Sequence, residues 1–276
     1  MSNLRIIYDN AADRAVLTAS SQAGALAPAN LLTERKSQVL RSIGTDLEIT
    51  ATLATGEIVG GLALPFCNLT SNAKIRVRGY AAPGDAEPVF DTGVILACAY
   101  APLGAWEWGG VPLGVNAFSY GGGTYGRTWW PRTTARHVII GLSDPDNPAG
   151  YIECSRLVLG NYWEPEYNAS YGASVTPVDT STQNRTAAGD MVIDTGFTYR
   201  KLSIALEHMT EQDRANLWRI VWGNGKRRPL FISLFPDHAD PELEQTYQIY
   251  GRLPDLAAIS TPYYQAFATT IDVEEI

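Results

Sequence analysis

The amino-acid sequence predicts a mainly β fold, with a β-sandwich or jelly roll over residues 1–165 and a small α+β unit over residues 191–276. Three observations lead to this prediction. Apolar and polar residues alternate in many short segments, which is the pattern of half-buried strands. Clusters of Gly, Pro, Asn and Asp separate these segments, as turns require. Only one segment has the periodicity and end signals of a convincing helix, which argues against an alternating β–α architecture.

The first 165 residues contain the clearest strand patterns. Residues 46–53 alternate between apolar and polar side chains, and the ATGE sequence that follows predicts a turn into a second strand. In residues 74–80, Ile75 and Val77 point inward while basic residues between them point to solvent. Further strands are expected at residues 58–66, 90–100, 135–142 and 151–160, and a short helix or irregular loop at residues 27–42.

Two aromatic segments depart from this pattern. Residues 103–133 combine many glycines with seven aromatic residues, which predicts a long loop or irregular hairpin inserted in the sandwich. Residues 151–172 leave a buried strand and enter a segment of mixed aromatic and turn residues. Because aromatic side chains contribute much of the energy of protein interfaces, we expect contact with another subunit before contact with a glycan or pure core packing. The candidate contact residues are Trp106, Trp108, Tyr120, Tyr125, Trp129, Trp130, Trp163 and Tyr167.

The second unit follows a linker or extended arm at residues 166–190. A strand is expected up to Leu206, and a helix begins after it. Thr210 is the candidate N-cap and Gly223 the stop signal. Two further strands are expected, at residues 228–236 and 264–276. The inward stripe of the helix is Leu217, Ile220 and Val221.

Composition and charge exclude several classes of partner. Charged residues make up 18% of the chain and the formal net charge is −8, whereas a phosphate-binding surface needs clustered Lys and Arg. We therefore expect no sequence-specific nucleic acid. No segment approaches the ~20 apolar residues of a membrane span, and no secretory signal is visible. We expect a soluble protein synthesised in the cytoplasm, with Cys67, Cys98 and Cys154 as buried hydrophobic residues in a reducing compartment.

The chain lacks the familiar sequence motifs of catalysis and of phosphate binding. Glu164 and Glu166 are the most notable pair of acids. Two glutamates two residues apart on a linker predict exposed charges, because a glycosidase pair must face a cleft from two sides. We expect no enzymatic activity and no cofactor, with a hydrolase whose site the sequence hides as the least favoured alternative.

Two loops contain residues that could bind a cation. Asp144 and Asp146 lie in SDPDNPAG, where Asp and Asn ordinarily serve the turn itself. His238 lies in an acidic loop whose spacing fixes no metal geometry. His137 on a strand is expected to be structural, and His208 before the helix is expected to be a surface or capping residue. We expect no metal site.

The first ~165 residues resemble a galactose-binding-like, discoidin-type β-sandwich. The resemblance rests on PANLLTERKSQVLRS, on the strands LEITATL, IVGGLAL and IRVRGY, and on ARHVIIGLSDPDNPAGYIECSRLVLG. The C-terminal unit resembles the ring-forming domain of distal tail and baseplate proteins of long-tailed bacteriophages. Its pattern is GFTYRKLSIALEHMTEQDRANLWRIVWGNGKRRPLFISLFP with the final FATTIDVEEI. The ring-like unit comes last here, whereas the common distal tail protein begins with it.

These resemblances imply a structural protein of a phage tail tip or baseplate, located in the virion. The C-terminal unit would form a homo-oligomeric ring, a trimer or hexamer, that joins the tail tube to baseplate hub proteins. The sandwich would decorate the outside of the ring and could contact host glycans. The alternative is a carbohydrate-binding adhesion module for host surface glycans that does not assemble. No sugar-contacting residues of discoidin-type modules map onto this sequence.

Overall fold

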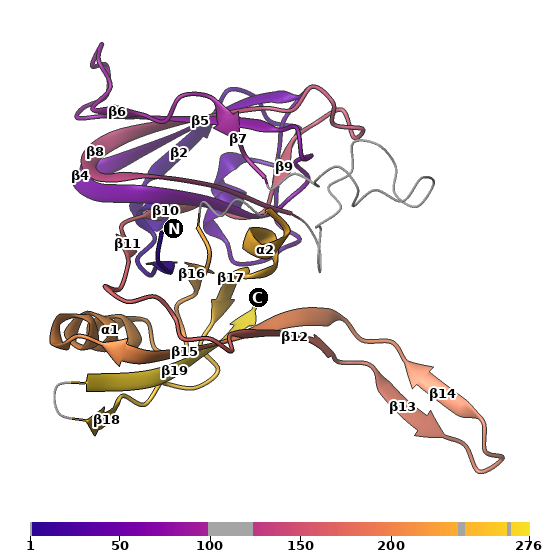
Figure 1. Ribbon diagram of the computed structural model, residues 1–276. Coiled ribbons are helices and arrows are strands. Elements are labelled where there is room, and N and C mark those ends of the chain that lie inside the picture. The colour runs from indigo at the N-terminus through magenta and orange to yellow at the C-terminus, as the bar shows by residue number, and fades with distance from the viewer. Residues whose placement is uncertain (1, 99–123, 237–240, 264–265) are drawn as a thin grey trace. The chain divides into compact units, whose positions relative to one another are not determined.

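The computed structural model of the chain (Figure 1) describes residues 2–98, 124–236, 241–263 and 266–276. Its contacts divide the chain into two compact units. The N-terminal unit is Met1–Pro165 together with Leu230–Gln248, and the C-terminal unit is Glu166–Pro229 together with Ile249–Ile276. The described residues form mainly antiparallel β-sheet, which confirms the predicted fold class.

Two long strands, β4 (Asp46–Cys67) and β8 (Thr124–Ser143), form the frame of the N-terminal unit. They pair antiparallel along most of their length, with a register shift between Thr52 and Glu57. Near this shift both strands bend, as Figure 1 shows. Bulges bend strands in this way, so one pair of strands can serve two layers. The first half of β4 and the second half of β8 lie in one layer of a sandwich, and their other halves lie in the second layer.

Shorter strands extend both layers. In the first layer, β2 (Val16–Ala19) pairs with the first half of β4, and β5 (Lys74–Tyr80) pairs with the second half of β8. In the second layer, β10 (Val158–Gly160) pairs with the second half of β4. Four of the two-residue strands of this unit are β3 (Leu40–Arg41), β6 (Phe90–Asp91), β7 (Ile95–Leu96) and β9 (Glu153–Cys154).

The apolar core lies between the two layers. Leu47 from the first half of β4 and Leu62 from its second half are buried in the same cluster of side chains. Ile75 and Val77 of β5 join this cluster, so the inward direction predicted for them is confirmed. Full burial of one such side chain contributes about 1.5–3 kcal/mol, and the cluster is therefore the main source of stability of this unit.

Some local expectations were wrong, most clearly where the pairing of β4 with β8 overrides the local pattern. The ATGE sequence does not end a strand but forms the exposed bend inside β4. At this bend a Cβ on Gly56 would lie 3.1 Å from the Thr134 side chain, so the two strands approach closely. Residues 124–133, expected in the insert, belong to β8. Of residues 90–98, the described part of the strand expected at residues 90–100, only β6 and β7 are strands, and Gly93 at φ +67° lies between them. The expectation for residues 27–42, a short helix or an irregular loop, is met by the short 3-10 helix η2 (Pro28–Leu32).

Three short strands of the N-terminal unit bring distant segments together. Strand β1 (Arg5–Ile7) pairs antiparallel with β11 (Tyr162–Trp163) on one side and with β16 (Leu230–Ser233) on the other. The sequence pattern had placed β16 in the second domain. Helix α2 (Pro241–Thr246) also belongs to the N-terminal unit, where buried Glu244 forms an ion pair with Arg127 of β8 at 2.7 Å. This charge-assisted contact attaches α2 to the sandwich.

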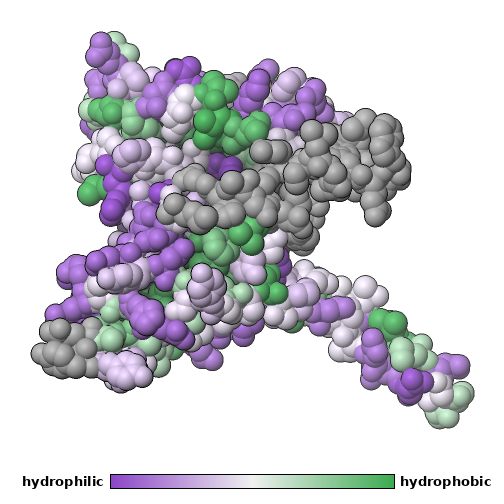
Figure 2. All heavy atoms as spheres, in the orientation of Figure 1, coloured by the Kyte–Doolittle hydropathy of each residue, from purple (hydrophilic) through white to green (hydrophobic). Residues whose placement is uncertain are grey.

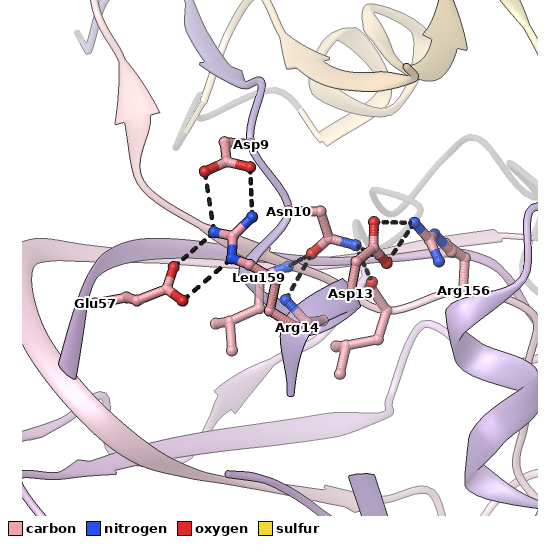
Figure 3. Close-up of polar contacts among 9 residues, drawn as sticks. Asp9, Asn10, Asp13, Arg14, Glu57, Arg156 and Leu159 are labelled. Carbon is pink, nitrogen blue, oxygen red and sulfur yellow. Dashed lines mark hydrogen bonds and ion pairs between the residues drawn. The ribbon is translucent and has the colours of Figure 1, made fainter. Parts of the chain in front are cut away.

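Charged side chains attach the N-terminal segment to the sandwich (Figure 3). Arg14, at the end of the 3-10 helix η1 (Ala11–Arg14), donates to Asp9 at 2.7 Å and to Glu57 at 2.6 Å. Arg156 is almost fully buried and donates to Asp13 at 2.9 Å. Burial raises the pKa of Asp13 above its ordinary value, and the charge of Arg156 opposes that rise.

The C-terminal unit contains a sheet built around β15 (Thr198–Met209) and β19 (Ala266–Glu275). Strand β12 (Ser174–Asp179) pairs with β15, while β17 (Gln248–Arg252) and β18 (Ser260–Tyr263) pair with β19. Strands β13 (Thr182–Arg185) and β14 (Met191–Asp194) form a separate hairpin between β12 and β15. Residues 166–190, expected to be a linker or extended arm, therefore contain the strands β12 and β13.

Helix α1 (Glu211–Asn224) packs against β15 and β19. The Thr210 hydroxyl accepts a hydrogen bond from the Asp213 backbone N–H at 3.2 Å, which confirms Thr210 as the N-cap. The helix ends at Asn224 and is capped by Gly225, whose φ of +53° suits glycine and which lies two residues beyond the predicted stop. The predicted inward stripe is buried: Leu217, Ile220 and Val221.

Candidate functional site

The eight candidate contact residues occupy different environments. Trp106, Trp108 and Tyr120 lie outside the described residues. Tyr125, Trp130 and Trp163 are buried, Trp129 is half-buried, and Tyr167 is exposed. Of the described candidates, Tyr167 is the one whose ring is open to solvent. Contact of this set with a subunit or a glycan stays a prediction.

The half-buried Trp129 has partners inside the N-terminal unit. Its ring meets the Tyr162 ring edge-on at 5.5 Å, and the Arg5 guanidinium lies 5.4 Å from the Trp129 ring and 4.8 Å from the Tyr162 ring. A Cβ on Gly61 would lie 2.4 Å from the Trp129 ring. The ring therefore lies directly on the glycine backbone of β4, where no other residue leaves enough space. This packing stabilises the sandwich and occupies the faces that a sugar would need.

Glu164 and Glu166 have different local roles. The Glu164 carboxylate accepts hydrogen bonds from the Asn3 backbone N–H at 3.1 Å and from Arg5 Nε at 3.3 Å. It is half-buried, whereas an exposed linker charge was expected. Glu166 is exposed, and its backbone N–H donates to the Asp213 carboxylate at 3.2 Å. Glu164 thus holds the first strand in place, a structural role.

The Asp144 turn is held by protein donors. The buried Asp144 carboxylate accepts from the Thr70 backbone N–H at 2.8 Å, from the Thr70 hydroxyl at 2.6 Å and from Asn147 Nδ2 at 3.1 Å. Its oxygens serve the turn, as the sequence predicts. Within the described ranges, no group of three or more His, Cys, Asp or Glu side chains could hold a metal ion. His238 lies outside those ranges.

The cysteines are buried and free, which confirms their predicted place in the core. The Cys67 thiol donates to the Thr124 carbonyl at 3.3 Å. A hydrogen bond with Cys67 and burial raise the pKa of Cys98 well above its ordinary value, and burial does the same for Cys154. Cys98 and Cys154 are therefore neutral thiols, which are poor nucleophiles. His137 Nδ1 lies 2.9 Å from the Thr52 hydroxyl, in keeping with a structural role.

Helix α1 presents two tryptophans to solvent. Trp218 and Trp222 lie four residues apart on the helix face opposite its buried stripe, so they are neighbours on the surface. Their ring centroids are 6.0 Å apart with an interplanar angle of 25°. Their exposures are 54% and 76%. Arg219, also exposed, lies beside them. Tryptophan and arginine are the residue types most enriched at the centres of protein interfaces.

The β13–β14 hairpin is the second exposed apolar surface of the C-terminal unit. All eight residues of its two strands are exposed. Met191, Val192 and Ile193 are among them, at 49%, 54% and 55% exposure. Figure 2 shows hydrophobic residues on this hairpin, which extends to the lower right of the view. Monomeric soluble proteins rarely leave large apolar side chains together on their surface.

Tyr167 lines a small cavity of the C-terminal unit. The cavity has a volume of about 490 Å³ and is lined by Tyr167, His208, Met209, Thr210 and Ala266. An exposed aromatic ring beside polar groups is a suitable surface for a sugar ring. The cavity therefore brings together one candidate contact residue and one histidine that were singled out separately.

The exposed tryptophans and the apolar hairpin strand were not among the candidate residues. Both carry a signal in the sequence. A helix whose inward stripe contains Leu217, Ile220 and Val221 turns positions 218 and 222 outward, and exposed tryptophan on a helix is uncommon. The MVID sequence after a turn-rich segment has the composition of a strand, with β-branched residues at its centre. No helix in the described part of the chain is long and apolar enough to cross a membrane.

No protein-family model and no curated protein matches this chain. Solved structures match about half of it at low identity. CpGH89CBM32-5 from Clostridium perfringens, in complex with GalNAc-β-1,3-galactose, is 10% identical and covers 55% of this chain and 100% of its own, with a TM-score of 0.37. A chitosan-binding module of a chitosanase/glucanase from Paenibacillus sp. IK-5 is 16% identical and covers 55% and 99%, with a TM-score of 0.38. The family 32 CBM of C. perfringens NanJ, in complex with galactose, is 11% identical and covers 59% and 100%, with a TM-score of 0.37. Because these TM-scores are low, the similarities say nothing about which ligand this chain binds.

Proposed function

We propose that this chain is a structural subunit that assembles with copies of itself through its C-terminal unit. By its sequence pattern, the assembly is a ring in the tail tip or baseplate of a long-tailed bacteriophage, with the tail tube and baseplate hub as neighbours. The protein belongs to the virion and acts by binding, with no catalytic step. The sandwich lies outside the ring.

The observation that carries the proposal is the exposed apolar surface of the C-terminal unit. Trp218 and Trp222 on α1 and the Met191–Ile193 strand of the hairpin expose large side chains that association would bury. Burial of apolar surface contributes roughly 25 cal/mol per Å², so these side chains favour association if the partner is complementary. The two surfaces differ from each other, and contact between unlike surfaces produces rings when the rotation closes.

The mass of the purified chain tests this proposal. One chain has a mass of 30.0 kDa. Size-exclusion chromatography with light scattering should give a multiple of that mass, three- or sixfold for the expected ring. A particle of single-chain mass at every concentration tested would overturn the proposal. Association driven by apolar burial is insensitive to salt, so the multimeric mass should persist in high salt. An assembly held by surface charge pairs would instead dissociate.

A second candidate function, binding of a host glycan, is favoured by the cavity beside Tyr167. A sugar ring stacked on the Tyr167 ring could hydrogen-bond to His208 or Thr210 at the cavity wall. The test is a glycan array probed with the wild-type chain and with Tyr167→Ala. Binding that is lost in this variant, and retained when exposed Tyr171 is replaced instead, would support the site. No binding by the wild-type chain would exclude it as a function.

A further inference from the structure

We propose that the β13–β14 hairpin of one copy docks on the exposed tryptophan face of α1 in a second copy. The tryptophan face is defined here as Trp218, Arg219 and Trp222. The inference rests on the proposed function, because it names the two surfaces through which the copies meet. Each of the two surfaces is covered by the other in a neighbouring copy.

The hairpin is the docking element because it lacks the support that a hairpin needs. A two-stranded hairpin is marginally stable in water unless its face packs on something. The four residue pairs of β13 and β14 bond to each other, from Thr182 opposite Asp194 to Arg185 opposite Met191. All eight residues are exposed, so within the described part of the chain neither face is covered. A partner surface would supply the missing support.

The register of the hairpin determines which side chains meet the partner. Side chains alternate between faces along a strand, so Met191 and Ile193 lie on one face and Val192 and Asp194 on the other. Met191 and Ile193 form a short apolar pair two residues apart. The flexible Met191 side chain and the branched Ile193 side chain suit the flat faces of two stacked indole rings.

Charge complementarity supports the same pairing. Asp190 and Asp194 flank the apolar strand of the hairpin and are exposed. The tryptophan face contains Arg219, and exposed Arg227 and Arg228 follow the end of α1. Each exposed pair contributes little energy, but opposite charges around an apolar centre fix the orientation of the contact and raise the rate of association.

The contact must form between two copies rather than within one. The hairpin precedes β15 and α1 follows it, so the twelve residues of β15 separate them. At a rise of ~3.3 Å per residue this strand is roughly 40 Å long, whereas a four-residue hairpin reaches only ~13 Å. In Figure 1 the hairpin extends away from α1, which lies at the other end of β15. Docking of the hairpin on α1 therefore joins unlike surfaces of neighbouring copies, the arrangement that closes a ring.

Site-directed cross-linking tests the pairing. We choose Ile193→Cys in the hairpin and Gly223→Cys beside Trp222, because a Cβ on Gly223 meets no atom within 4 Å and both tryptophans stay in place. The native cysteines are buried. A bismaleimide reagent should join chains of the double variant into a ladder of covalent multimers on a denaturing gel. The control combines Gly223→Cys with Ile43→Cys, an exposed position in the N-terminal unit, and should remain a single band.

Light scattering and cross-linking together distinguish failure of the hairpin contact from failure of self-assembly. Multimers by light scattering without a ladder would overturn the hairpin contact and leave self-assembly intact. A wild-type chain that is monomeric would overturn the proposed function. As a second measurement, Trp218→Ala with Trp222→Ala should raise the dissociation constant of the assembly roughly 100-fold, the effect expected for two central interface residues. Ile43→Ser should leave it unchanged. An unaltered dissociation constant in the tryptophan variant, with an unchanged circular dichroism spectrum, would contradict the inference.

Discussion

The carboxylate of Asp144 accepts hydrogen bonds from both the backbone N–H and the hydroxyl of Thr70, at 2.8 and 2.6 Å. The two residues are 74 positions apart, so the contact joins the end of β8 to the loop before β5. Replacement of Asp144 by Ala would leave buried donors without an acceptor. We predict a loss of about 2–4 kcal/mol in the free energy of unfolding of the N-terminal unit, measured by urea titration.

Asp146 is the matched control for this prediction. It lies in the same turn, but its hydrogen bond to Asn72 at 3.2 Å is exposed. Asp146→Ala should therefore cost less than about 1 kcal/mol. The structural role of Asp144 would be wrong if both variants unfolded at the same urea concentration, or if added calcium stabilised the wild-type chain.

Among the polar contacts of the C-terminal unit, the buried ion pair of Arg200 and Glu275 should contribute most to the free energy of unfolding. Arg200 Nη2 lies 2.6 Å from the Glu275 carboxylate, and both side chains are buried. Glu275→Ala would leave a buried guanidinium without its partner, at a cost of about 3–5 kcal/mol. Glu274→Ala is the control, because Glu274 pairs with Lys201 at 3.6 Å and both side chains are only half-buried. Unfolding monitored by tryptophan fluorescence should show a lower midpoint for Glu275→Ala than for Glu274→Ala. Equal midpoints would contradict the larger role of Glu275.

Asp91 should titrate well below an ordinary aspartate. The hydrogen bonds from Arg76 lower its pKa from 3.8 to about 2. A depressed folded-state pKa means that the stabilising contribution is present above the unfolded pKa, near pH 4, and is lost as the pH falls toward 2. The pair is at the surface, so this contribution is only about 0.5 kcal/mol. Carboxyl-carbon NMR should give the low pKa in the wild type and a value near 4 in Arg76→Ala; an ordinary value in both would contradict the pairing.

The three cysteines should not react with a thiol reagent while the chain is folded. They are buried, and the raised pKa of Cys98 and Cys154 keeps both protonated at neutral pH. A colorimetric thiol assay should detect almost no reaction in buffer and all three thiols in urea. Rapid reaction of one thiol in the folded chain would show that the packing around it opens.

Local sequence patterns were sufficient to predict the burial or capping role of a residue where that role depends only on its own strand or helix. Ile75 and Val77 alternate with charged residues, and burial alternates in the same way. Thr210 caps α1 because its hydroxyl reaches the Asp213 N–H within the same turn. Both features depend on neighbours within a few residues, so they can be read from the sequence.

The features that could not be predicted depend on distant partners. Residues 54–57 have turn composition, yet β8 stays paired on both sides of them, and the result is a bend in place of a chain reversal. Strand β16 looks like part of the second domain, but β1 at the other end of the sequence pairs with it. Trp129 falls in the segment expected to be a long loop or irregular hairpin, whereas Gly61, far away in the sequence, provides the flat backbone beneath its ring.

Electron microscopy of the purified full chain tests most directly whether the chain assembles with itself through its C-terminal unit. We expect closed ring particles whose class averages have threefold or sixfold symmetry. Particles of single-chain size on the same grids, with no ring at any protein concentration, would contradict it.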